Sequence, residues 1–111
     1  MKKRKTFAIL LDDLELLESR FDTQFDLSDA LKDYFEESFN KNNFEVIYKI
    51  PRSVYEKART QKNVFLEQSV LDKYNGYIVN RFGIKKRKEM DNYLSRVFTS
   101  LSHEYANKMR K

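Results

Sequence analysis

Two clusters of basic side chains are the residues of this chain best suited to chemistry, and that chemistry is the binding of phosphate. They comprise Lys2, Lys3, Arg4 and Lys5 near the amino terminus and Lys85, Lys86, Arg87 and Lys88 further on. Each phosphate that such side chains neutralise on duplex DNA steepens the log–log salt dependence of binding by about 0.9. We therefore expect phosphate contacts from both clusters. The alternative is a solvated helix start that only aids solubility.

Three further charged residues flank a short segment that alternates apolar and polar side chains. Lys49 and Arg52 lie at its carboxyl end and Glu45 near its start. Lys49 and Arg52 could contact bases or phosphates, or could be ordinary surface charges. Glu45 could accept a hydrogen bond from the amino group of cytosine, although a structural ion pair is the commoner role for such a residue.

The remaining polar residues assemble no catalytic site. The chain has no Cys and a single His, His103, so thiolate chemistry and His-rich metal sites are excluded. The acidic pairs at residues 12–13 and 36–37 are adjacent on expected helices and so point in different directions. Tyr74 and Tyr77 could stack on single-stranded bases, but core packing is the commoner use of such residues. We expect a protein that is not an enzyme and that needs no metal or cofactor.

Charge is distributed unevenly along the 111 residues. Residues 1–40 contain 6 Lys+Arg and 10 Asp+Glu, a net charge of −4, whereas residues 41–111 contain 16 and 7, a net charge of +9, which together give the overall +5. This pattern indicates a polyanionic partner for one surface and allows the acidic part to face the basic part. No apolar run is long enough to span a bilayer, so we expect a cytoplasmic protein that does not bind membranes.

A strand followed by two helices is expected twice. In residues 1–40, the alternation of Phe7, Ile9 and Leu11 predicts a strand at 6–11. Asp12 or Asp13 would cap a helix to about residue 21, and Ser28 would cap a second helix to about residue 39. Residues 40–43 read as the linker.

The second copy is expected over residues 44–83. A strand at 44–50 leads to Pro51, which suits the first turn of a helix that extends to about residue 61. A turn at 62–64 and a helix at 65–82 follow, in which Asn75 and Gly76 could mark a break and Gly83 a stop. Residues 84–111 form an appended amphipathic helix that either closes the core or makes an oligomer contact.

Two segments of the chain resemble the ribbon-helix-helix family, to which the Arc and MetJ repressors belong. The segment from Ser28 to Phe35 is similar to the opening of the family's second helix, and the segment from Lys49 to Tyr55 resembles the junction of strand and first helix. The resemblance implies a mostly α fold in which tandem units, 1–40 and 44–83, pair two short antiparallel strands above four helices. The appended helix at 84–111 completes one compact fold.

The resemblance also implies how such a protein would bind duplex DNA. The paired strands enter the major groove, and outward side chains contact base edges. Those side chains would be Thr6, Ala8 and Leu10 from the first strand and Glu45, Ile47 and Lys49 from the second. Backbone amides at the start of each second helix would hold phosphates, which places them around Ser28 and Asp29 and around Phe65 and Leu66.

The two copies could pair within one chain, similar to the tandem TraY-type accessory proteins of conjugative plasmids, or between two chains of a homodimer. We favour the first arrangement because the linker is short. The expected role is that of a plasmid relaxosome accessory factor, which could assist a larger relaxase or replication protein, or of a transcriptional repressor. The alternative is a phage or mobile-element module that binds a replication or host protein.

Overall fold

The chain is mostly helical, and the order strand, helix, helix occurs twice in it. The computed structural model describes residues 2–41, 50–84 and 86–110. The elements are β1 (Lys2–Leu10), α1 (Leu11–Glu18), α2 (Gln24–Asn40), the short 3-10 helix η2 (Arg52–Glu56), β2 (Arg59–Glu67), α3 (Gln68–Phe82) and α4 (Arg87–Arg110). The described residues therefore form four α-helices and one sheet of two strands.

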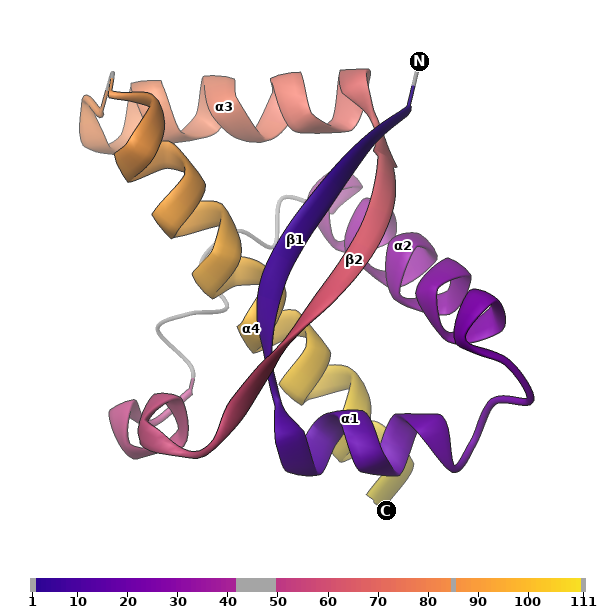
Figure 1. Ribbon diagram of the computed structural model, residues 1–111. Coiled ribbons are helices and arrows are strands. Elements are labelled where there is room, and N and C mark those ends of the chain that lie inside the picture. Colours follow the sequence, from indigo (N-terminus) through magenta and orange to yellow (C-terminus); the bar gives the residue numbers. More distant parts are fainter. Residues whose placement is uncertain (1, 42–49, 85, 111) are drawn as a thin grey trace.

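The two strands form an antiparallel ribbon within one chain. Thr6 lies opposite Asn63, and each is the fifth residue of a nine-residue strand, so the midpoints of the two strands coincide. In Figure 1 the ribbon crosses the front of the molecule, and α1 and α3 leave it at opposite ends. α4 packs behind β1 and α2 packs beside β2. The helices thus cover one face of the ribbon, and the other face looks outward.

The strand that pairs with β1 is not the expected one. The expected strand at 44–50 lies outside the described residues except for Ile50, which is not in a strand, and all of β1 pairs with β2. The helix expected from Pro51 to about residue 61 is reduced to the single 3-10 turn of η2, and the expected turn at 62–64 lies inside β2. The second strand, helix, helix segment is therefore 59–110.

The helix starts also differ from the expected caps. α1 begins directly after β1, and no side chain of Asp12 or Asp13 caps it. α2 begins at Gln24 rather than after Ser28, because the Thr23 hydroxyl accepts a hydrogen bond from the Asp26 N–H at 3.0 Å. This bond satisfies one of the backbone N–H groups that a helix start leaves without a partner.

The expected break at Asn75 and Gly76 is absent, since α3 runs unbroken from Gln68 to Phe82. Its stop at Gly83 is confirmed. Gly83 has φ 65°, and its N–H donates to the Val79 carbonyl at 3.0 Å. A side chain at this φ would be strained, so glycine ends the helix at low cost.

An aromatic cluster under the ribbon forms the centre of the core. Phe7 of β1 packs edge-on against Phe35 of α2 and Phe98 of α4, with ring centroids 5.5 and 5.4 Å away. Phe35 and Phe98 stack with centroids 4.6 Å apart. Because α4 supplies Phe98, Leu94 and Leu101 to the buried core, it is an integral part of the fold and not an appendage.

Candidate nucleic-acid interface

The ribbon has one buried face and one open face because side chains alternate along each strand. Phe7 and Ile9 of β1 and Val64 and Leu66 of β2 point toward the helices, and each is 2% exposed or less. Their neighbours in sequence point the opposite way. The ribbon therefore presents to solvent a row of side chains that the core does not use.

We call this row the outer face. It consists of Lys2, Arg4, Thr6 and Ala8 from β1 and Arg59, Gln61, Asn63, Phe65 and Glu67 from β2. All are exposed except Ala8 and Glu67, which are half-buried. Three of these side chains are cationic and three more carry a hydroxyl or an amide. The outer face can therefore supply both positive charge and directional hydrogen bonds.

Thr6 and Asn63 meet at the centre of the outer face. The Thr6 hydroxyl donates to the Asn63 side-chain oxygen at 2.5 Å. This bond holds the amide of Asn63 in one orientation and leaves its N–H₂ group directed elsewhere. A positioned amide loses less side-chain entropy on binding a partner than a free one.

The three side chains of β1 that were expected to contact bases, here called readers, differ in their exposure to solvent. Thr6 is exposed on the outer face, and Ala8 is half-buried, with its carbonyl accepting a hydrogen bond from the Thr99 hydroxyl of α4. Leu10 is 2% exposed, so its expected role as a reader is wrong. It is the last residue of β1, where the chain turns into α1 and the buried side of the fold covers it.

The readers expected on the second strand, Glu45, Ile47 and Lys49, lie outside the described residues. The structure places Gln61 and Asn63 in the corresponding position opposite β1. Sequence reasoning missed both because residues 59–63 contain no apolar side chain to reveal the alternation. A signal was nevertheless present, because Val64 and Leu66 repeat the two-residue spacing of Phe7 and Ile9 at a distance of 57 residues along the chain.

The backbone amides that were expected to hold phosphates do not lie at helix starts, because the helices begin at other residues than expected. Ser28 and Asp29 lie in the second turn of α2, where their amides bond within the helix. The free amides of α2 belong instead to the residues around Thr23 and Gln24. Phe65 and Leu66 are in β2, so their expected position at a helix start is wrong.

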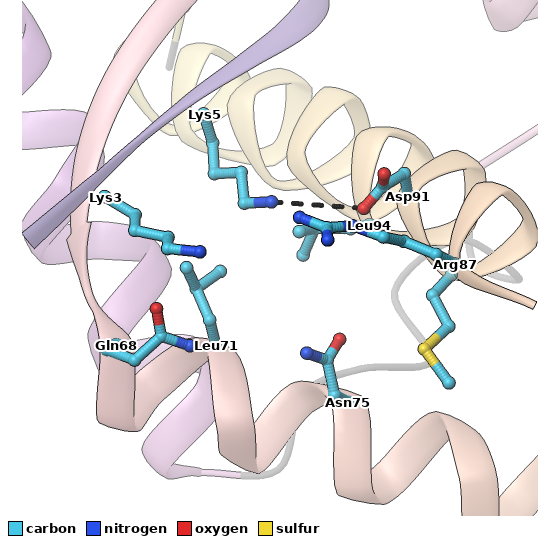
Figure 2. Close-up of a pocket in the computed structure, with 9 residues that line it drawn as sticks. Lys3, Lys5, Gln68, Leu71, Asn75, Arg87, Asp91 and Leu94 are labelled. Atoms are coloured by element: carbon cyan, nitrogen blue, oxygen red, sulfur yellow. Dashed lines mark ion pairs between the residues drawn. The ribbon is translucent and has the colours of Figure 1, made fainter. Parts of the chain in front are cut away.

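The two basic clusters meet at one place. The side chains of Lys3 and Lys5 extend from β1 toward Arg87 at the start of α4, across a cavity of about 350 Å³ (Figure 2). Lys86 and Lys88 are exposed beside it, while Lys85 lies outside the described residues. Arg52 is exposed as the first residue of η2, and the strand expected before it lies outside the described residues except for Ile50.

A second cavity of about 460 Å³ lies between the outer face and the start of α2. Phe25 and Phe65, which are 74% and 54% exposed, line it together with Lys2, Ser28 and Asp29. Its wall is more apolar than that of the first cavity. The two exposed rings thus form a small apolar patch beside the outer face.

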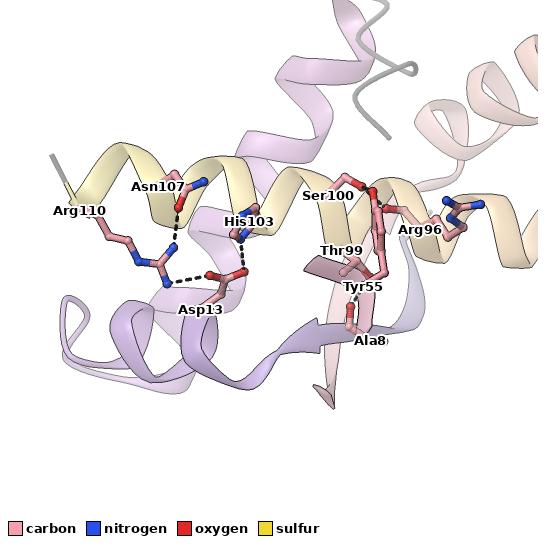
Figure 3. Close-up of polar contacts among 9 residues, drawn as sticks. All are labelled: Ala8, Asp13, Tyr55, Arg96, Thr99, Ser100, His103, Asn107 and Arg110. Atoms are coloured by element: carbon pink, nitrogen blue, oxygen red, sulfur yellow. Dashed lines mark hydrogen bonds and ion pairs between the residues drawn. The ribbon is translucent and has the colours of Figure 1, made fainter. Parts of the chain in front are cut away.

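The side of α4 that faces α1 carries a buried ion cluster rather than a reactive site. Asp13 is 1% exposed and accepts a hydrogen bond from Nη2 of Arg110 at 2.8 Å, and its second oxygen lies 2.9 Å from Nδ1 of His103 (Figure 3). Asn107 accepts a further bond from the Arg110 guanidinium at 2.6 Å. A fully partnered carboxylate of this kind joins α1 to the carboxyl-terminal end of α4, and we assign it a structural role.

The end of the ribbon near α1 carries less free charge than the end near α3. Lys62 of β2 donates to the Gln24 side-chain oxygen at 2.8 Å, and the Gln24 amide donates to Glu18. Burial lowers the pKa of Lys62, and the nearby Glu18 carboxylate opposes that shift. These contacts engage the one lysine on the buried face at this end, so free positive charge gathers at the end built by β1, α3 and α4.

The tyrosines of α3 contribute to the core. Tyr74 is fully buried and stacks on Phe39 with centroids 5.6 Å apart, and Tyr77 is partly buried against Phe82. Neither presents a free ring for base stacking. Packing in the core, the commoner of the two roles considered for them, is confirmed.

The described residues contain no cluster of His, Cys, Asp or Glu that could hold a metal ion. Within the same part of the chain, no helix has the length and apolar character required to cross a bilayer. Comparison of the sequence with protein-family models, with curated proteins and with solved structures gives no match.

Proposed function

We propose that the protein binds duplex DNA with the outer face of its ribbon in the major groove. The observation that carries this proposal is the outer face itself, an exposed antiparallel ribbon on which three side chains are cationic and three more carry a hydroxyl or an amide. The major groove is about 12 Å wide and admits a two-stranded ribbon. Nine residues per strand span about 30 Å at 3.3 Å per residue, so the central side chains can reach bases while the ends lie over the backbone.

The side chains at the centre of the outer face match the edges of base pairs. Gln61 and Asn63 have the amide geometry that bonds adenine at N6 and N7, and Arg4 has the fork that bonds guanine at O6 and N7. Thr6 can bond either base or touch a thymine methyl. The oxygen of Asn63 accepts from Thr6 and retains a second lone pair for the N6 amino group. Each such bidentate contact contributes about 1–3 kcal/mol of discrimination.

We further propose that the fold is a tandem ribbon-helix-helix arrangement in a single chain. Support comes from the repeated order of elements, the coincident midpoints of the strands and the helices packed under one ribbon face. The two strands present different readers: Arg4 and Thr6 on one, Gln61 and Asn63 on the other. The target would accordingly be asymmetric, since a palindrome requires the same readers on both half-sites.

By analogy of fold, the role is that of a site-marking factor such as a relaxosome accessory protein or a repressor. In this role the basic end of the ribbon would contact the backbone. The acidic helices α1 and α2 would face a second protein, for example a relaxase or a replication protein.

One observation favours the second candidate function, a protein-interaction module. Phe25 and Phe65 are both exposed around the second cavity, next to the acidic side of α2. A partner with apolar side chains would fit there without DNA. In that case the Phe25→Ala variant would lose the partner, while duplex DNA would bind weakly or not at all.

A binding titration with matched variants tests the proposal. A duplex selected from a random pool is titrated at two salt concentrations with the wild type, with Gln61→Ala and Asn63→Ala, and with Asn80→Ala as an exposed amide control on α3. We expect salt-dependent binding that each ribbon variant weakens about 5- to 100-fold and that Asn80→Ala leaves unchanged. Absence of binding at low salt, or equal effects of all three variants, would refute it.

A further inference from the structure

The cavity between β1, α3 and α4 is built from more cationic side chains than the fold requires. Its polar lining consists of Lys3, Lys5, Gln68, Asn75, Arg87 and Asp91 (Figure 2). Leu71 and Leu94 form an apolar wall. At about 350 Å³ it falls in the size range of about 300–1,000 Å³ found for small-ligand sites.

The charges around the cavity are only partly compensated. Lys5 lies 3.9 Å from the Asp91 carboxylate, a distance that corresponds to a loose ion pair. Among the described residues, neither Lys3 nor Arg87 has an ion-pair partner within 4 Å. Three cations and one carboxylate therefore line the space, which leaves a net charge of about +2.

The neutral groups at the cavity suit an oxygen-rich anion. Asn75 is exposed on α3, and its amide can donate toward the cavity. The Gln68 amide already donates to Asp72 at 2.8 Å and so is held in place at the rim. Arg87 offers the planar fork that bonds two oxygens of one phosphate at once, and the two lysines supply point charges.

We propose that this cavity binds a phosphate group. A phosphomonoester carries a charge of about −1.5 to −2 at neutral pH, which matches the net charge of the lining, and its oxygens can accept from Lys3, Lys5 and Arg87 together. The same chemistry has two sources: a free phosphorylated small molecule, or a phosphate of the DNA backbone beside the ribbon. The site stands on the cavity itself and does not depend on the proposed binding of DNA.

In the sequence the two lysines lie far from Arg87, and only the fold brings these three cations together. Lys3 and Lys5 belong to the first strand, whereas Arg87 begins the last helix. Toward the other end of the ribbon, Lys62 is engaged with Gln24. A phosphate at this site would therefore bind one end of the ribbon only.

The test is a titration of inorganic phosphate into the full chain at constant ionic strength, with chloride as the balancing anion. Chemical shifts of the Leu71 and Leu94 methyl groups and of the Arg87 side chain report binding. We expect saturable shifts at these groups, and we expect Lys3→Gln and Arg87→Gln each to raise the dissociation constant about ten-fold. Lys73→Gln, which removes an equal charge from an exposed position of α3 that does not line the cavity, should leave it unchanged.

Two results would overturn the site: shifts that never saturate, or an equal loss of affinity in Lys73→Gln. Circular dichroism of each variant establishes that it is folded. A second arm repeats the series with a mononucleotide and with a short duplex. If Lys3→Gln weakens binding of the mononucleotide but not of the duplex, the ligand is a free phosphorylated molecule. If it weakens binding of both in parallel, the ligand is a phosphate of the DNA backbone. Because the phosphate arm contains no DNA, failure of the proposed function leaves its result intact.

Discussion

Replacing Asp13 with alanine should destabilise the fold by about 2–3 kcal/mol. The Asp13 carboxylate is 1% exposed and has two partners on α4, the Arg110 guanidinium at 2.8 Å and the His103 ring at 2.9 Å. A hydrogen bond to a charged group contributes about 1.5–3 kcal/mol. The His103 contact, with a side chain 15% exposed, is expected to keep most of that value. The Arg110 contact is reduced to about 0.5–1 kcal/mol by solvent, because that side chain is 37% exposed.

Urea unfolding followed by circular dichroism measures this effect, with Asp12→Ala as the matched control. Both aspartates lie in the first turn of α1, so both interact with the helix dipole, but only Asp13 is buried. The difference between the two variants therefore isolates the ion cluster. In a thermal scan of the same two variants, we expect a melting temperature about 10 °C lower for Asp13→Ala than for Asp12→Ala. Equal stability of the two variants would refute the reasoning that this cluster joins α1 to α4.

Three further predictions follow from the core and its polar contacts. Phe98→Ala should lower the unfolding free energy by about 3–5 kcal/mol, because its ring touches three other buried rings; a loss below about 1 kcal/mol in urea unfolding would contradict the central aromatic cluster. Tyr55→Phe should cost about 0.5–1.5 kcal/mol through loss of its contact with a serine of α4, and an unchanged urea midpoint would show that η2 is not anchored there. Burial, together with the Glu104 hydrogen bond, raises the pKa of Tyr34, and burial also raises the pKa of Tyr105. As the pH rises, these phenols therefore lose their protons in the unfolded chain before they do so in the folded one. The unfolding free energy should consequently fall as pH rises above about 10. Stability that rises over this pH range would contradict it.

The elements in which apolar residues recur at a regular spacing could be predicted from the sequence. The first strand, the two helices after it and the last helix follow from the spacing of residues such as Phe7, Leu31, Phe35 and Phe98, and the structure contains all four. The observed boundaries differ from the expected ones by a few residues, because several nearby hydroxyl groups are equally able to cap a helix. Thr23, not Ser28, is the residue whose hydroxyl bonds the start of α2.

The second strand could not be predicted because its stability comes from its partner. Residues 59–63 are polar and charged, and only pairing with β1 fixes them in an extended conformation. Strand preference depends on such cross-strand contacts more than on the residues themselves. The helical spacing from residue 65 onward therefore dominated the prediction, and it placed the start of a helix at Phe65 and Leu66, which belong to the strand.

The candidate site was predicted in outline and not in detail. Thr6 is exposed on the first strand, where it was expected to contact bases, and the two basic clusters meet at one cavity. Gln61 and Asn63 were missed together with the strand that carries them. The meeting of Lys3 with Arg87 is a property of the tertiary fold and has no local signal.

Site-specific crosslinking tests the central claim most directly, because the chain has no Cys of its own. Asn63→Cys and Asn80→Cys each provide one thiol for a photoactivated crosslinker, the first on the outer face and the second on α3. With a duplex selected from a random pool, we predict crosslinks to bases of the major groove from position 63 and none above background from position 80. Equal yields, or crosslinks from position 80 alone, would show that the ribbon does not enter the groove.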